Sequence, residues 1–337
     1  MNDKIYGSLL GAAVGDAMGA ATETRSLEQI KEKFGGLVKD FVEIPEDVFA
    51  RGMPKGSVTD DFSLAYVTAR TIIEHDGKVD RSCAEDALLN WSKTKFYKMA
   101  GPTTVAAVER LKGNILPNPY DFLTVDNAKG SNGSAMKISP AALVSGGDPD
   151  TAIRNAVTIC MPTHGNSTSL SAACAVSAAI AAALHEDADL DKVFEVALYG
   201  AKTGEEIGIG LNKRLACPSV YKRMLLAREI ALKYKDDFEK CLKELSDIIG
   251  SGLAAAEAVP CAFGILYLTD ADPLQTAIAG VNIGNDTDTV ATIAASIAGA
   301  LKGSSAFPEG YCDLIDSVNG FDLKATAEGL ERVSRVR

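Results

Sequence analysis

Two acidic and two hydroxyl side chains open an apolar stretch in the last fifth of the chain. Asp286-Thr287-Asp288-Thr289 directly precedes residues 290–301, which are almost entirely apolar. In the first turn of a helix, Asp286 and Thr289 lie three apart on one face, and Asp288 can turn to the same side, so three oxygen ligands can converge. Ordinary capping is the alternative, because Asp and Thr are preferred at helix starts. However, two acids entering a buried helix repel each other unless a cation lies between them.

The same combination of side chains occurs a second time. Thr59-Asp60-Asp61 precedes another apolar helical stretch at residues 62–73. Two such helix starts together can hold one or two Mg²⁺ or Mn²⁺ ions, since these cations prefer carboxylate, hydroxyl and water oxygens. Four full carboxylate charges outweigh the opposing helix dipoles, and Zn²⁺ is disfavoured because no His or Cys lies nearby in sequence. The predicted metal ligands are Thr59, Asp60, Asp61, Asp286, Asp288 and Thr289.

The N-terminal stretch, residues 3–19, is predicted to be a helix with a row of glycines spaced four apart. Such a row allows close approach of another backbone, which would pack a central helix tightly. Asp16 lies between Val14 and Met18 on this helix and therefore needs a polar partner. Glu23 follows where the chain leaves the helix, and on its own it would be an ordinary surface acid.

A run of small residues, 129–136, is the best candidate for contact with phosphate groups. Small side chains let backbone amides approach an anion, although a flexible turn with a helix cap would have the same composition. His164 lies between two long apolar helices, where it is either a hydrogen-bonded core residue or a ligand contact. Gly101 begins Gly-Pro-Thr-Thr, which is also simply a good helix start.

Five motifs of this chain, and their order along the sequence, resemble those of the ADP-ribosylglycohydrolase family. They are the glycine-spaced stretch 7–19 with Asp16, the two acid motifs at 59–61 and 286–289, the loop 130–140, and Thr163-His164-Gly165-Asn166. The resemblance spans essentially the whole chain. There are two departures: Phe62 stands where Thr often follows the Asp-Asp pair, and Asn285 replaces a second Gly before Asp286.

The resemblance implies a role for each matching residue. Glu23 matches a Glu at the metal centre that can act on the attacking water, so it is the first candidate for the general base, with Asp61 and Asp288 as alternatives. Two Mg²⁺ or Mn²⁺ ions are implied as cofactors. The implied substrate-binding residues are Gly101, Gly130, Ser131, Asn132, Gly133, Ser134, Met136, His164, Gly165 and Asn166.

The implied reaction is metal-assisted hydrolysis of an N- or O-glycosidic bond at the anomeric carbon of an ADP-ribosyl group on a protein or small molecule. A nucleoside or other small ribosyl N-glycosidase is the alternative within the same chemistry, because ions that bind a ribose diol would serve any ribofuranoside. A noncatalytic ADP-ribose-binding protein is a third possibility. It would require the loss of metal ligands, and each expected Asp and Thr of the two motifs is present.

Composition narrows the class of protein further. The 337 residues have a formal net charge of −11, which argues against a standing nucleic-acid partner. The start of the chain has no signal-peptide pattern and no run is convincing as a membrane span. Seven scattered cysteines are typical of reduced core residues in a cytoplasmic protein. The oligomeric state stays open between monomer and dimer.

The elements that must position these residues are predicted to be helices. A hydrophobic share of 47% with only 6% aromatics indicates a large core of helices packed through small side chains. We expect a single all-α domain over residues 1–337: a compact multi-helix orthogonal bundle around a central apolar helix at residues 167–184, with a binuclear metal site in a cleft. The turn-rich stretch 39–48 has room for a short strand.

Overall fold

The computed structural model describes residues 2–117, 120 and 122–334, and within them the chain is helical. The described residues contain no β-ladder, so the all-α prediction is confirmed, and the short strand expected at 39–48 is wrong because that stretch runs as turns and irregular chain. The α-helices are α1 (Asn2–Gly19), α2 (Leu27–Phe34), α3 (Asp60–Glu74), α4 (Arg81–Trp91), α5 (Pro102–Leu111), α6 (Ser139–Leu143), α7 (Pro149–His164), α8 (Ser167–Ala183), α9 (Leu190–Gly210), α10 (Val220–Lys233), α11 (Phe238–Glu244), α12 (Ala255–Leu268), α13 (Pro273–Val281), α14 (Thr287–Lys302), α15 (Tyr311–Asn319) and α16 (Leu323–Ser334). Four short helical turns join them: η1 (Lys95–Met99), η2 (Asn127–Lys129), η3 (Asn132–Ser134) and η4 (Leu245–Ile249).

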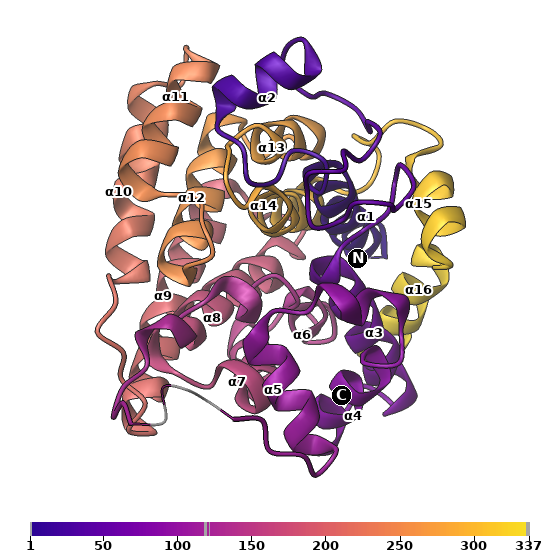
Figure 1. The fold of residues 1–337 in the computed structure, drawn as a ribbon, viewed down its shortest axis with the longest axis vertical. Coiled ribbons are helices and arrows are strands. Elements are labelled where there is room, and N and C mark those ends of the chain that lie inside the picture. The colour runs from indigo at the N-terminus through magenta and orange to yellow at the C-terminus, as the bar shows by residue number, and fades with distance from the viewer. Residues whose placement is uncertain (1, 118–119, 121, 335–337) are drawn as a thin grey trace.

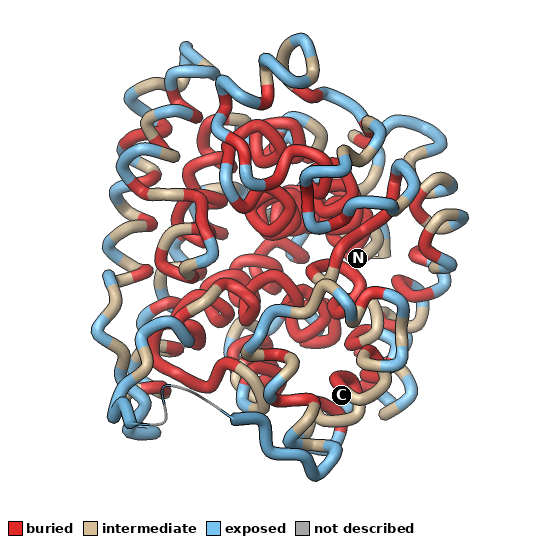
Figure 2. Tube along the Cα trace, viewed as in Figure 1, coloured by how far each residue is buried: buried red, intermediate tan, exposed pale blue. Residues whose placement is uncertain are grey.

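Two helices, α8 and α14, form the centre of the bundle. Every residue of α8 is buried, as is every residue of α14 up to Leu301. Figure 1 shows α13 and α14 nearly end-on while α10 runs across the view, so the helices cross rather than align. In Figure 2 the buried positions gather in the interior, and the exposed positions lie on outer helices such as α10 and α15. The predicted central helix at 167–184 is therefore one of two.

Helices α1 and α14 pack with their backbones in contact. A Cβ atom added at Gly15 would lie 2.5 Å from the carbonyl carbon and oxygen of Ala291, and one added at Gly7 would lie 2.5 Å from Gly299 O. The glycines of α1 that approach α14 in this way are Gly7, Gly11, Gly15 and Gly19. The order of their partners along α14 is reversed, so the two helices are antiparallel, and the tight packing predicted from the glycine row is confirmed.

Helices α8 and α9 pack in the same way. The glycines of α9 that leave no room for a side chain beside α8 are Gly200, Gly204 and Gly208. Their partners on α8 are the backbones of Cys174, Leu170 and Ser167. Close helix packing through small residues thus recurs on both central helices, which explains how a chain with few aromatics buries so much of its surface.

Polar side chains define where the helices begin. Ser26 forms a capping box with Gln29 at the start of α2, and Asp80 accepts a hydrogen bond from the Cys83 amide at the start of α4. Asp148 accepts one from the Thr151 amide at the start of α7. Ser and Asp are among the residue types preferred at helix starts. Among the described helices, none is both long and apolar enough to cross a bilayer.

The α1–α14 contact can be tested with Gly15→Ala. The added methyl group must push against the Ala291 backbone, which cannot move aside like a flexible side chain, so we expect a loss of about 1–3 kcal/mol in the free energy of unfolding. Gly210→Ala in α9 is the control. No atom lies within 4 Å of its added Cβ, and helix propensity favours Ala by up to about 1 kcal/mol. Chemical denaturation of both variants measures this difference, and equal stabilities would contradict it.

Candidate functional site

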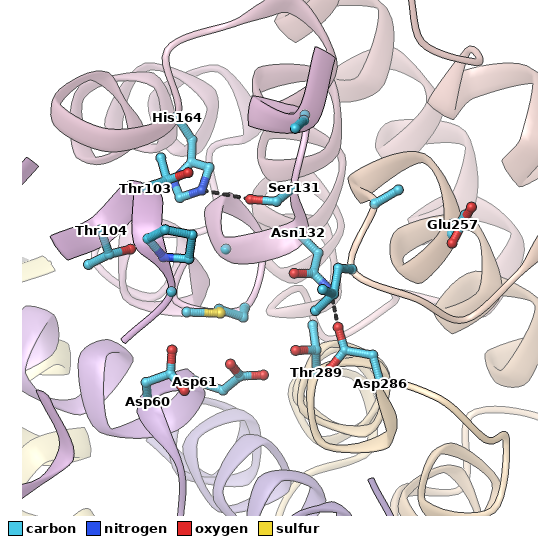
Figure 3. A pocket seen from close by; sticks show the side chains of 18 of the residues that line it. Asp60, Asp61, Thr103, Thr104, Ser131, Asn132, His164, Glu257, Asp286 and Thr289 are labelled. Carbon is cyan, nitrogen blue, oxygen red and sulfur yellow. Dashed lines mark hydrogen bonds between the residues drawn. The ribbon is translucent and has the colours of Figure 1, made fainter. Parts of the chain in front are cut away.

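The starts of α3 and α14 and the segment after α1 meet at one cavity of about 640 Å³. Figure 3 shows Asp60 and Asp61 on one side of this cavity, with Asp286 and Thr289 facing them and Ser131 and Asn132 above. Glu23 lines the cavity together with six residues of the two acid motifs: Thr59, Asp60, Asp61, Asp286, Asp288 and Thr289. Segments more than 200 residues apart in the sequence therefore contribute to one site.

Asp16 positions the first acid motif. Its carboxylate, at 0% exposure, accepts hydrogen bonds from the Thr59 amide at 2.9 Å and from the Phe62 amide at 2.8 Å. Asp16 thus caps the start of α3 from a neighbouring helix, which is the polar partner its buried position required. Burial raises the pKa of Asp16 to about 7, although the two amides oppose that shift.

Phe62, the first departure from the family pattern, packs away from the cavity. Its ring is fully buried and contacts the rings of Tyr66 and Phe321. Its side chain is not among those that line the cavity. The side chain at position 62 therefore belongs to the core and adds no other functional group to the site.

The second acid motif is joined to Glu23 by a pair of backbone hydrogen bonds. The Thr24 amide donates to Asn285 O at 2.7 Å, and the Asn285 amide donates to Arg25 O at 2.8 Å. Both Thr24 and Asn285 adopt left-handed conformations, with φ of 67° and 63°. Asn tolerates this conformation better than most non-glycine residues. Asn285, the second departure from the family pattern, therefore keeps the left-handed backbone conformation that a glycine would allow.

Asp286 occupies the N-cap position of α14. Its side chain makes no capping hydrogen bond to α14, and its Oδ2 instead accepts one from Asn132 Nδ2 at 2.6 Å. Thr59, by contrast, does cap α3 through the Asp61 amide at 3.2 Å. Ordinary helix capping therefore explains the side chain of Thr59 but not that of Asp286.

The acids form a buried cluster without enough positive charge to balance it. One carboxylate oxygen each from Glu23, Asp286 and Asp288 lies within 4.8 Å of the others. Burial, followed by repulsion from Asp286 and Asp60, raises the pKa of Glu23 to about 8, and the Arg25 charge only partly opposes this. Burial and neighbouring carboxylates also raise the pKa of Asp61 and Asp288 well above the usual range.

The cluster has the donor chemistry of a site for hard cations. Glu23 Oε2, Asp61 Oδ2 and Asp288 Oδ1 are buried and accept no hydrogen bond from the described residues. A buried carboxylate oxygen without a donor is costly unless a cation or bound water satisfies it. All the ligand atoms are carboxylate or hydroxyl oxygens, which Mg²⁺ and Mn²⁺ prefer. The residues present therefore fit a metal centre.

The loop at 130–136 joins the acid cluster to His164. Ser131 Oγ lies 2.9 Å from His164 Nε2, while Asn132 donates to Asp286. A Cβ atom added at Gly133 would lie 3.0 Å from His164 Cε1, so Gly133 packs against the imidazole. The loop is also held to the start of α12, where the Asn132 amide donates to Leu253 O. It is therefore a fixed wall of the cavity rather than a free turn.

The structure separates the predicted substrate-binding residues into two groups. Those that line the cavity are Gly101, Gly130, Ser131, Asn132, Gly133, Met136 and His164. Ser134, Gly165 and Asn166 are not among the lining residues. Ser134 Oγ donates to Ser169 O, Gly165 ends α7, and Asn166 caps α8 through the Ser169 amide. These three hold neighbouring elements in place, because their side chains or backbone are used within the fold.

Sequence reasoning missed several lining residues. Phe49, Met99, Leu253, Arg223 and Glu257 line the cavity from loops and helix ends that carry no recognisable motif. Phe49 and Leu253 are 67% and 70% exposed, so they form an apolar rim. Only their place in the fold reveals them, since isolated apolar residues on loops give no sequence signal.

We expect the metal-free protein to lose stability as the pH rises. Asp16, Asp60 and Glu23 have folded pKa values of about 7, 7 and 8, above their unfolded values near 4. The protonated forms of these acids therefore contribute their full stabilisation below about pH 4, and this stabilisation is lost as the pH rises from about 4 to 8. Because Mg²⁺ bound to the charged cluster would offset the repulsion, it should raise Tm more at about pH 8 than at about pH 5.5.

Thermal unfolding in EDTA and in Mg²⁺ measures both effects. Asp288→Asn should reduce the Mg²⁺-dependent rise in Tm, because it removes one cluster charge. Asp236→Asn, at an exposed position between α10 and α11, is the matched control and should keep the full rise. An equal Mg²⁺ effect at both pH values would contradict this account of the cluster.

Comparison with known proteins identifies the relatives of this site. The profile of the ADP-ribosylglycohydrolase family matches residues 1–337. The chain is 29% identical over 346 residues to the uncharacterized protein YegU of Escherichia coli strain K12, covering 99% of this chain and 98% of that protein. It is 27% identical over 355 residues to ADP-ribosylhydrolase ARH3 of Xenopus tropicalis, covering 93% of each.

A solved structure agrees at the level of the fold. An ADP-ribosylglycohydrolase-related protein complex superimposes with a TM-score of 0.61 at 23% identity, over 99% of this chain and 98% of that chain. Family, fold and the acidic cavity therefore lead to one conclusion: this chain belongs to the ADP-ribosylglycohydrolase family and is a hydrolase that acts on glycosyl bonds.

Proposed function

We propose that this protein is a metal-dependent hydrolase that cleaves the N- or O-glycosidic bond at the anomeric carbon of an ADP-ribosyl group. The observation that supports this most directly is the convergence of Glu23 with the two acid motifs, where three buried carboxylate oxygens lack a donor. Relatives named as ADP-ribosylhydrolases support the ADP-ribosyl group as substrate.

The residues that would hold two Mg²⁺ or Mn²⁺ ions belong to the two acid motifs. They are Thr59, Asp60, Asp61, Asp286, Asp288 and Thr289. When bound, the ions would supply positive charge that orients the ribose hydroxyls and the attacking water. Two further residues support this set: Asp16 positions the α3 start, and Asn132, which also lines the cavity, holds Asp286.

Glu23 is the proposed general base. Burial, followed by repulsion from the neighbouring acids, raises its pKa to about 8 in the metal-free cluster, and cations between the acids would lower that pKa toward the neutral range in which a base works well. Glu23 accepts a proton from the water whose oxygen attacks the anomeric carbon, and the leaving group departs with the electron pair of the broken bond. The leaving group takes up a proton from solvent, and Glu23 returns its proton to solvent. The surrounding carboxylates stabilise the positive charge that develops on the sugar.

The wall formed by Ser131, Gly133 and His164 is the proposed contact for the distal part of the substrate. Ser131 has a hydroxyl on the cavity surface, and Gly130 and Met136 border it on the same loop. The apolar rim of Phe49 and Leu253 would cover uncharged parts of the bound molecule. This side of the cavity is the one that would distinguish substrates from one another.

A neutral riboside is a second candidate substrate, favoured by the charges along the cavity. Six acids line it: Glu23, Asp60, Asp61, Glu257, Asp286 and Asp288. Among the described residues, the Arg or Lys side chain that lines it is Arg223, and its guanidinium already donates to Ile249 O and Ala256 O. A nucleosidase would thus avoid repulsion that a diphosphate meets. A noncatalytic ADP-ribose-binding protein is disfavoured because both acid motifs are intact.

The role of Glu23 predicts a specific kinetic change. Glu23→Gln keeps the size of the side chain but cannot accept the proton, so kcat should fall by about 10² or more while substrate affinity changes only a few fold. Glu32→Gln, at an exposed position on α2, is the control and should retain full turnover. Steady-state kinetics of both variants in Mg²⁺ measure this, and an unchanged kcat in Glu23→Gln would assign the base to Asp61 or Asp288.

Turnover of matched substrates decides between the two candidate substrate classes. We expect a higher kcat/KM for an ADP-ribosylated peptide or ADP-ribosylated small molecule than for nucleosides, and loss of both activities in EDTA, since one metal centre would serve either bond. Release of ribose or ADP-ribose can be followed by chromatography. Faster cleavage of nucleosides would overturn the ADP-ribosyl proposal, and full activity in EDTA would overturn metal dependence.

A further inference from the structure

Arg25 is a buried arginine two residues after Glu23. Its side chain is 9% exposed, and its guanidinium keeps a positive charge in the folded protein. Nη1 donates to two backbone oxygens, Ala21 O at 3.3 Å and Glu23 O at 3.1 Å. Among the described residues, neither oxygen accepts a hydrogen bond from any other group. The hydrolysis described above gives this side chain no role.

The turn that carries Glu23, residues 20–24, depends on these two hydrogen bonds. It follows the end of α1, and Thr24 within it has a φ of 67°, which a β-branched residue rarely adopts. The Thr24 amide donates to Asn285 O at 2.7 Å, which fixes the turn to the acid motif of α14. Ala21 is fully buried and Glu23 is 8% exposed, so carbonyls left without a donor there would be costly. The guanidinium therefore provides the donors that this turn needs from within the protein.

The other end of the guanidinium contacts a loop that borders the cavity, the rim loop (residues 44–53). Nη2 lies 2.5 Å from Asp47 Oδ1 in an ion pair rather than an aligned hydrogen bond. Phe49, two residues further along this loop, lines the cavity. The residues on either side of Phe49 are buried in one apolar cluster with Ala20, the first residue of the Glu23 turn. One side chain thus contacts both the Glu23 turn and the rim loop.

We propose that Arg25 is a positioning residue, which holds the backbone of Glu23 in the geometry that its carboxylate needs and joins that turn to the rim loop. Its hydrogen bonds go to backbone oxygens of the turn, so the guanidinium acts on the carboxylate by placing it. A lysine at this position would keep the charge, but its single ammonium group could not replace two nitrogens of a planar fork that contact different segments. The role of Glu23 in the reaction rests on the proposed function, whereas the contacts of Arg25 do not.

Amide hydrogen exchange of the whole chain tests the positioning directly. In Arg25→Met, we expect exchange at least about 10-fold faster at the Thr24 and Asn285 amides, which bond across the turn, and in the rim loop. Exchange in α8 should stay unchanged, because none of the contacts of Arg25 involves that helix. Unchanged exchange in the turn or the rim loop would overturn the proposal. An equal acceleration in α8 would also overturn it, since that would indicate a general loss of stability.

Lys33→Met is the matched control for charge. Lys33 also pairs with Asp47, at 3.3 Å, but it donates to no carbonyl of the Glu23 turn. Its replacement should therefore leave exchange in both segments within about 2-fold of the wild type, as expected for an exposed ion pair. An acceleration equal to that in Arg25→Met would assign the effect to charge beside Asp47 and contradict the proposal. Arg25→Gln takes the place of Arg25→Met if the latter does not fold.

A double-mutant cycle connects Arg25 to the reaction in the Mg²⁺-loaded enzyme. Arg25→Met should lower kcat by about 10-fold or more, because a small displacement of a catalytic group is costly, and Arg25→Lys should lower it almost as far. In the Glu23→Gln background, Arg25→Met should lower kcat by less than about 2-fold, because no base is left to position. Additive losses, or wild-type kcat in Arg25→Lys, would refute the positioning role. If the wild type cleaves neither an ADP-ribosylated substrate nor a nucleoside, the proposed function fails, whereas hydrogen exchange still decides what Arg25 holds.

Discussion

The contact between the backbones of α1 and α14 is the constraint on which the rest of the site depends. Because glycines remove the side chains from this face of α1, the two helices approach until Gly15 lies against Ala291 and Gly19 against the α14 start. That approach brings the segment carrying Glu23 beside the acid motif that opens α14. A larger residue at these positions would push the two helices apart and so separate Glu23 from the acids at the α14 start.

The burial and mutual repulsion of the clustered acids oppose folding. Favourable interactions elsewhere in the structure must offset this free-energy cost. The raised pKa values of Glu23 and Asp60 show that their charged forms are disfavoured where they lie. Thr24 and Asn285 add left-handed backbone conformations beside the cluster. The closely packed central helices provide the compensating stability, and bound cations would remove the repulsion. The cluster is therefore unfavourable as long as no positive charge neutralises it.

The loop at 130–136 connects the reacting centre to the distal wall of the cavity. Asn132 reaches Asp286 and Ser131 reaches His164, so adjacent residues contact the two regions. The short antiparallel bridge to Ala254 keeps the loop in place. A change in the wall, for example at Gly133, is thus expected to alter how a ligand is held without removing any of the acids.

The sequence by itself determined the helices, their capped starts, the glycine row and the two acid motifs, because these follow from local propensity and short spacing. It also indicated that Asp16 needs a partner, since a buried acid is costly alone. Only the tertiary structure decided that this partner is the start of α3, that Asn285 preserves a left-handed backbone, and that Ser134, Gly165 and Asn166 face the fold rather than the cavity. The direction of a side chain, like the rim of Phe49 and Leu253, depends on contacts between segments far apart in the chain, which local patterns do not encode.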